Sequence, residues 1–202
     1  LKALALGSIK QMTEPRREGN VWVIPEGRNL IYELGREGMR MKHIRTLSLP
    51  DKAKRHFTQT YEDRNGTLWA GTNNGLFTFS LRDNQWHTVC DTLGQVSARK
   101  EDKQGNLWIG TTNKGLYQQS SKGKCKKIPS SLSITCLSVQ EDSLIWIGTQ
   151  EGGVYALNPQ TGKLTDHTRL CGLNGNIVNQ LEFDVYGHLW IDTNQKLIEY
   201  NP

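Results

Sequence analysis

The chain has 202 residues, with 22% charged and 36% hydrophobic side chains and a formal net charge of +5. This composition is ordinary for a globular protein and excludes a disordered one, and the length suits one domain or one piece of a repeat array. No apolar run approaches the roughly 18 residues that span a bilayer, and no basic stripe carries interleaved aromatics. We therefore expect neither direct membrane contact nor a nucleic-acid partner.

The N-terminus and the cysteines give little information about targeting, metal binding or disulfides. The apolar start, Leu1 to Leu6, is too short for a signal peptide. The four cysteines form no Cys-x-x-Cys pair and lie near no histidine at zinc-ligand spacing, so we expect no metal site. Three disulfide pairings are open to them, although cysteines this sparse are more often small buried apolar residues. They are Cys90, Cys125, Cys136 and Cys171.

One seven-residue stretch recurs along the chain. Residues 105–111 read Gly-Asn-Leu-Trp-Ile-Gly-Thr, and close copies lie at 66–72, 143–149 and 187–193, with a decayed copy at 19–25. A period of about 40 residues fits propeller blades. Helical repeats of that length would need amphipathic runs, which are absent, whereas Gly and Asn punctuate segments rich in Thr, Val, Ile, Trp and Tyr. The tryptophans that mark the period are Trp22, Trp69, Trp108, Trp146 and Trp190.

Each repeat contains the pattern of a four-stranded antiparallel sheet. In the second repeat we expect strands at 56–63, 67–72, 76–80 and 85–89, joined by turns rich in Asn, Asp and Gly. Further strands are expected at 115–119, 152–157 and 176–184. The whole chain is thus predicted to be a single all-β propeller region. Its approximate blades are 1–50, 51–92, 93–130, 131–172 and 173–202, the last ending after its third strand.

Strand geometry gives the repeated residues structural roles. Side chains alternate faces, so Trp108 points to one side of its strand while Leu107 and Ile109 point to the other. A strand that is apolar on both faces must be covered on both, as happens when blades stack around an axis. We therefore expect the tryptophans to pack between blades, and Gly110 to leave clearance for a close neighbour.

These residues carry a family resemblance. The unit Asp-x-x-Gly-Asn-Leu-Trp-Ile-Gly-Thr, a polar turn and then Gly-Leu-Tyr resembles the two-component regulator propeller repeat, most strongly at 63–79, 102–117 and 142–155. The fifth repeat departs from it, with Asp192 and Lys196 in place of glycines. The resemblance implies a seven-bladed sensor region of a bacterial hybrid two-component system. It also implies a periplasmic or extracellular location, a glycan-derived ligand, and signalling to a histidine kinase elsewhere in the parent protein.

Five repeats leave two arrangements open. In the favoured one the chain is a piece of a larger, seven-bladed propeller, and its partner is the rest of that propeller or another copy of the chain. In the other, Leu1 to Leu6 supply the missing outer strand of the last blade and close a five-bladed ring. An open piece would expose strand edges and self-associate, whereas a closed ring would be monomeric.

The sequence offers no enzymatic machinery. The five histidines match no metal or triad spacing, and no glycine-rich loop opens a helix, so we expect no catalytic residue and no cofactor. Two binding functions remain. A protein–protein scaffold would carry an exposed aromatic patch, whereas a sensor would bind an oligosaccharide or another small polar ligand on loops at one face of the ring.

Amide and charged side chains gather on the turns that follow the second strands and on the last connection. They suit sugar hydroxyls and carboxylates, although Asn and Gly are also what tight turns need. The candidate ligand-binding residues are Asn73, Asn74, Asn113, Lys114, Gln150, Glu151, Asn194, Gln195, Asn174, Asn176 and Asn179.

Overall fold

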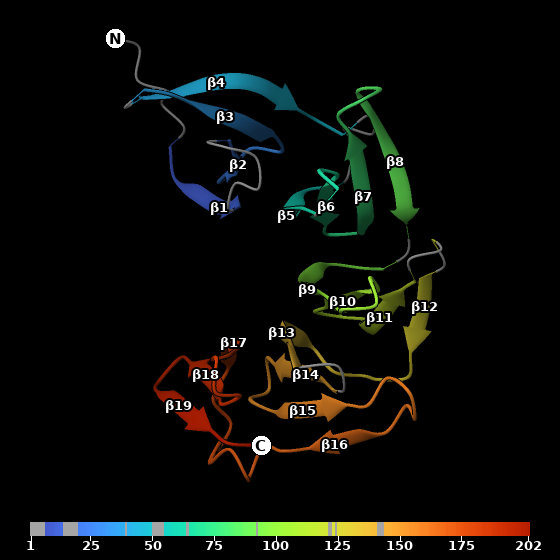
Figure 1. The fold of residues 1–202 in the computed structure, drawn as a ribbon, viewed down its shortest axis with the longest axis vertical. Helices are drawn as coiled ribbons and strands as arrows, with labels where there is room; N and C mark the ends of the chain where they lie inside the picture. The colour runs from blue at the N-terminus through green and yellow to red at the C-terminus, as the bar shows by residue number, and fades with distance from the viewer. Residues whose placement is uncertain are drawn as a thin grey trace. The chain divides into compact units, whose positions relative to one another are not determined.

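The structure is a computed structural model that describes residues 7–13, 20–38, 40–49, 55–63, 65–91, 93–120, 123, 125–140 and 144–202. All the regular secondary structure in these ranges is β-strand, and the strands form five antiparallel sheets (Figure 1). The all-β blade architecture predicted from the repeats is confirmed. Within the described ranges, no helix is long and apolar enough to cross a membrane. Leu1 to Leu6, Gly19 and Asp142, which belong to the proposed outer strand and to two of the repeats, lie outside the described ranges.

The chain divides into two compact units, residues 1–95 and 96–202. The expectation of a single region therefore stays a prediction. The first unit holds two four-stranded meanders, in which each strand pairs with the next. One contains β1 (Ile9–Thr13), β2 (Val21–Pro25), β3 (Ile31–Glu37) and β4 (Arg40–Leu47), and the other β5 (Phe57–Glu62), β6 (Leu68–Thr72), β7 (Gly75–Ser80) and β8 (Gln85–Cys90).

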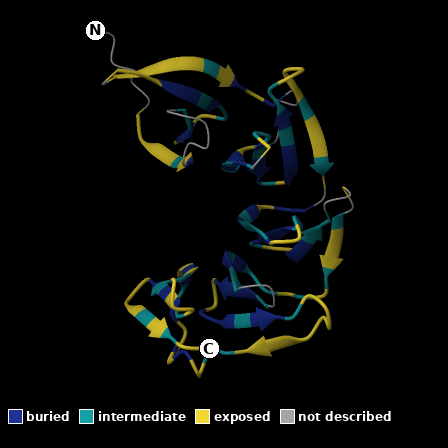
Figure 2. Ribbon diagram, in the orientation of Figure 1, coloured by how far each residue is buried: buried dark blue, intermediate teal, exposed yellow. Residues whose placement is uncertain are grey.

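The second unit holds three sheets of the same topology. The third sheet contains β9 (Val96–Glu101), β10 (Leu107–Thr111), β11 (Gly115–Gln119) and β12 (Cys125–Ile128). The fourth contains β13 (Ile134–Gln140), β14 (Leu144–Thr149), β15 (Val154–Leu157) and β16 (Leu164–Asp166). The fifth has three strands, β17 (Val178–Phe183), β18 (Leu189–Thr193) and β19 (Leu197–Tyr200). Within this unit β13 lies beside β9 and β17, while β10 and β14 are almost entirely buried and β12 and β16 are largely exposed (Figure 2).

The repeated aspartate closes the turn between the first and second strands and holds the tryptophan. Asp102 accepts hydrogen bonds from the backbone N–H of Asn106 at 2.8 Å and from the indole Nε1 of Trp108 at 2.9 Å. Asp63 does the same for Thr67 and Trp69. Because this bond joins residues six positions apart, the Asp fixes the turn and the orientation of the indole together.

The repeated threonine closes the next turn. The Thr111 hydroxyl donates to the carbonyl of Gly115 at 2.8 Å and accepts from the N–H of Lys114 at 3.0 Å. Thr72, Thr149 and Thr193 hold their turns through the same pair of contacts. Burial of these hydroxyls is tolerated because each is fully hydrogen-bonded.

Inside each unit the tryptophan face of one sheet packs on the following sheet. Trp22 belongs to the cluster that includes Phe57 and Leu68 of the second sheet. Trp108 packs with Ile134, Leu137 and Ile147 of the fourth sheet. Trp146 packs with Val178, Leu181 and Ile191 of the fifth. These three tryptophans are buried, as predicted for residues between blades.

The glycine two residues after the tryptophan leaves room for the neighbouring sheet, as expected. A Cβ on Gly148 would lie 2.6 Å from Val178 Cγ1 in the next sheet and closer still to Cys136 Sγ. A Cβ on Gly110 would likewise collide with Ile134 of the next sheet. Any larger residue at these positions would push two sheets apart.

Two tryptophans depart from the prediction. Trp190 is 36% exposed, so the expectation that every repeat tryptophan packs between blades is wrong for the fifth sheet. The reason is that no described sheet of its unit covers this face, which carries Asp192 where Gly110 and Gly148 stand in the preceding sheets. Trp69 is only half-buried.

All four cysteines are free, with Cys136 and Cys171 buried as small apolar residues.

Candidate functional site

The hairpin turns and the connections between sheets meet at one end of the second unit. The N–H of Gln150 donates to the Ser133 carbonyl at 2.9 Å, and the Ser133 hydroxyl donates to the Thr112 carbonyl at 2.8 Å. The N–H of Asn194 donates to the Ile177 carbonyl at 3.2 Å. We call this end the turn face: turns 112–114, 150–152 and 194–196 with connections 129–133 and 167–177.

Most of the predicted ligand-binding side chains project from the turn face into solvent. They come from three consecutive sheets and combine amides with charges of both signs. Asn179 is also exposed, on β17 just beyond the second connection. The exposed residues on the turn face itself are Asn113, Lys114, Gln150, Glu151, Asn174, Asn194 and Gln195.

Asn176 differs from this group. It is 7% exposed, and its backbone lies against Gly152, where a Cβ would come within 2.6 Å of the Asn176 nitrogen. Gly152 has a φ of +84°, which also favours glycine. Asn176 therefore contributes to the packing of the connection, and its proposed contact with ligand stays a prediction.

Two predicted residues belong to the first unit. The Asn73 side-chain oxygen accepts from the N–H of His56 at 2.7 Å, and the Asn73 N–H donates to the His56 carbonyl. These bonds tie the β6–β7 turn to the start of β5, so the amide of Asn73 has a structural task. Asn74 is exposed at the tip of the same turn.

The first unit also has an open groove of about 510 Å³. Trp86 and Phe79 lie in its wall with ring centroids 5.1 Å apart, and the Trp86 indole donates to the Ser48 carbonyl at 2.9 Å. Ile44, on the edge strand β4, contributes an exposed apolar side chain. Sequence reasoning did not find this groove because Trp86 lies outside the repeated motif.

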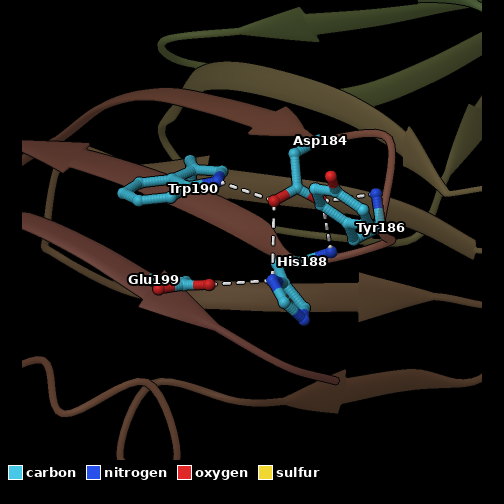
Figure 3. Close-up of polar contacts among 5 residues, drawn as sticks. All are labelled: Asp184, Tyr186, His188, Trp190 and Glu199. Carbon is cyan, nitrogen blue, oxygen red and sulfur yellow. Dashed lines mark hydrogen bonds and ion pairs between the residues drawn. The ribbon is translucent and has the colours of Figure 1, made fainter.

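A third feature lies on the fifth sheet, where Asp184, His188 and Glu199 converge (Figure 3). His188 Nδ1 is 2.8 Å from Glu199 Oε1 and 3.5 Å from Asp184 Oδ2. Burial by itself would raise the pKa of Asp184. Hydrogen bonds from the N–H groups of His188 and Tyr186 and from the Trp190 indole lower this pKa by more than burial raises it. The net effect is a pKa below the usual range, so the carboxylate is ionised at neutral pH.

The sequence contained signals for part of this chemistry. The six-residue spacing of Asp63 to Trp69, Asp102 to Trp108 and Asp184 to Trp190 recurs, and so does the threonine that holds each turn. Both could have been identified as structural from recurrence alone. Glu199 could not, because only the pairing of β18 with β19 brings it to His188.

Comparison with known proteins agrees with the geometry. Residues 53–74 and 92–113 match the family described as "Two component regulator propeller", so the resemblance carried by the repeats is confirmed. No curated protein matches the chain at a significant level.

Solved structures with the same fold include two extracellular domains assigned to hybrid two component systems of B. thetaiotaomicron. One has a TM-score of 0.76 at 19% identity and the other 0.74 at 17%, and both alignments cover 96% of this chain. A catalytically inactive virginiamycin B lyase from Staphylococcus aureus, with quinupristin, aligns at a TM-score of 0.70 and 15% identity over 96% of this chain and 69% of the lyase. At these identities the likeness establishes the fold. The chain spans 27% and 28% of the length of these two extracellular domains.

Proposed function

We propose that the chain is a ligand-sensing propeller module of a hybrid two-component sensor. Its ligand is a glycan-derived molecule, neutral or anionic, that binds at the turn face. The observation that carries the proposal is the placement of exposed amide and charged side chains from three consecutive sheets at one end of the second unit. Similarity to extracellular domains of hybrid two component systems supports a sensor role.

The chemistry of the turn face fits a polyhydroxylated ligand. Amides donate and accept hydrogen bonds together, which suits adjacent sugar hydroxyls. Lys114 supplies a cation for a carboxylate of an acidic sugar, and Glu151 supplies an acceptor for hydroxyl donors. The backbone beneath is fixed by the buried threonines, so these side chains are presented from a rigid base.

The remaining parts of the proposal follow from the similarity. The module lies on the periplasmic or extracellular side of the bacterial inner membrane and binds its ligand without turnover. It passes the signal to a histidine kinase elsewhere in the parent chain, with the rest of the propeller or another copy of the chain as its partner.

Calorimetric titration of the chain with neutral and acidic oligosaccharides tests this function. We expect saturable binding without product, and about tenfold weaker binding when Lys114→Ala or Asn113→Ala removes one hydrogen bond. Lys163→Ala is the matched control, since Lys163 lies in the β15–β16 turn at the opposite end of its sheet. Turnover of any sugar would overthrow the sensor proposal, and equal losses in the control would remove the turn face from it.

A protein–protein scaffold is the second candidate, favoured by the groove of the first unit. An aromatic wall beside an edge strand is the kind of surface that anchors a partner side chain. Ile44→Lys would place a charge in the groove and abolish such an association, while Ile9→Lys, at an equally exposed isoleucine on β1, would leave it intact. Cross-linking in cells of the source bacterium distinguishes the two variants.

A further inference from the structure

We propose that Asp184, His188 and Glu199 form a binding site for a divalent transition-metal ion, with Zn²⁺ as the best fit. Asp184 and His188 lie in the β17–β18 turn, directly after β17 and directly before β18, and Glu199 lies on β19; their donor atoms lie within 4.8 Å of one another. The inference is independent of the sensor function.

The distances between donor atoms suit a tetrahedral ion. Zn²⁺ binds nitrogen and oxygen at about 2.0–2.2 Å, which places neighbouring ligand atoms roughly 3.3 Å apart. His188 Nδ1 lies 2.8 Å from the Glu199 oxygen and 3.5 Å from the Asp184 oxygen, on either side of that value. Figure 3 shows Nδ1 turned toward both carboxylates, so small rotations of the three side chains would admit the ion.

The composition of the donor set selects the class of ion. One imidazole nitrogen with two carboxylate oxygens suits Zn²⁺ and its first-row neighbours, whereas Mg²⁺ and Ca²⁺ prefer oxygen ligands alone. Three protein ligands leave a position for water or for a ligand from another molecule. The Trp190 indole donates to Asp184 Oδ2 at 3.1 Å and fixes the orientation of that carboxylate.

The other sheets show that the cluster is not a product of the repeat. Asn106 stands in the third sheet where His188 stands in the fifth. Opposite the tryptophan, Glu199 takes the place of Gln118 in the third sheet and Ala156 in the fourth. Two metal-ligating residues have thus entered the fifth sheet at neighbouring positions of two strands.

The surroundings favour a cation. Glu182 and Asp192 lie on the same face of the fifth sheet as Glu199, since they pair directly opposite Trp190 and Leu197. Lys100 neutralises Glu182 through contacts of 2.9 and 3.0 Å, whereas Asp184 and Glu199 lie directly beside His188. The side chains are 24%, 31% and 51% exposed for Asp184, His188 and Glu199, so an ion from solvent can reach them.

The decisive experiment is calorimetric titration of the chain with ZnSO₄ in a non-chelating buffer. It uses a Cys90→Ser, Cys125→Ser background, because these two thiols are half-buried and could also bind zinc. We expect one ion per chain. Removal of a ligand in His188→Ala or Glu199→Gln should weaken binding by at least the 10–100-fold typical for loss of a supporting contact. His87→Ala is the matched control, since His87 pairs with the single carboxylate of Asp83 at 3.5 Å.

Two further readouts keep the test decisive if a variant is unstable. Glu199→Gln preserves the size of a strand residue and should fold, and bound Zn²⁺ should raise the Tm of the parent but not of this variant. Co²⁺ in place of Zn²⁺ should give a spectrum without thiolate charge transfer. Absence of zinc binding by the parent, or binding that His188→Ala and Glu199→Gln leave unchanged, would overturn the site and leave only an ion pair between the imidazole and two carboxylates.

Discussion

The fourth and fifth sheets carry the same motif in different surroundings. Trp146 is completely buried, and its indole lies against the rings of His167, Phe183 and Tyr200 at centroid distances of 4.8, 6.1 and 6.0 Å. Trp190 occupies the corresponding place in the fifth sheet and is 36% exposed. The difference lies in what covers each tryptophan face.

This comparison shows that the motif specifies a strand and a turn, and that the energetic importance of its tryptophan depends on a neighbouring sheet. In the fourth sheet, which packs against the fifth, the second residue after the tryptophan is Gly148 and the tryptophan itself is buried. In the fifth sheet that position is Asp192, and Glu182 and Glu199 flank the tryptophan. The same local structure therefore supports a core in one sheet and a polar surface in the other.

Replacing the two tryptophans gives the largest expected difference. Trp146→Ala should lower the free energy of unfolding by about 3–5 kcal/mol, because a buried aromatic leaves a cavity between two sheets. Trp190→Ala should cost about 1 kcal/mol or less, as for a surface residue. Urea denaturation of both variants measures the two values, and equal losses would show that Trp190 is also covered in solution.

The glycine position sharpens the comparison. Gly148→Ala should destabilise by about 1–3 kcal/mol, because the added Cβ would press on Val178 and Cys136 and separate the sheets. Asp192→Ala should change stability by no more than about 0.5 kcal/mol. Thermal melts of the pair suffice, and a destabilised Asp192→Ala would indicate that the carboxylate is engaged.

The reactivity of the cysteines gives a further, smaller test of the packing between the fourth and fifth sheets. Burial raises the pKa of the Cys136 and Cys171 thiols to about 11, and both belong to the cluster between the fourth and fifth sheets. At pH 8 we expect Cys90 and Cys125, which are half-buried, to react with a thiol reagent much faster than these two. Four equal rates would contradict a closed interface.

The raised pKa values also affect stability at high pH. The folded state holds the two thiol protons more tightly than the unfolded state, where the thiols ionise near pH 9. The stabilisation is fully present below pH 9 and is lost as the pH rises toward about 11. Cys136→Ala and Cys171→Ala together should flatten this decline in denaturation curves.

Much of the fold could be predicted because the motif encodes local structure. Alternation of faces around Trp108 and positive-φ turns such as Gly105 and Gly115 specify strands and hairpins over a few residues. The predicted strands at 67–72 and 85–89 agree with β6 and β8 within one residue. The site was harder to predict. Asn73 holds its turn by accepting a hydrogen bond from the N–H of His56, and Asn176 packs on Gly152. In the sequence, both residues look like any exposed amide.

The sequence by itself determined the repeat, the strand order, the glycine clearance and the positions of the turns, because each depends on residues close together in the chain. Tertiary structure decided which tryptophans are buried, which amides are engaged in packing, and that His188 faces Glu199. Those outcomes depend on which sheet lies against which face and on the register between strands. Contacts of this kind join residues that no local pattern relates, so an identical motif can be a core in one sheet and a surface in the next.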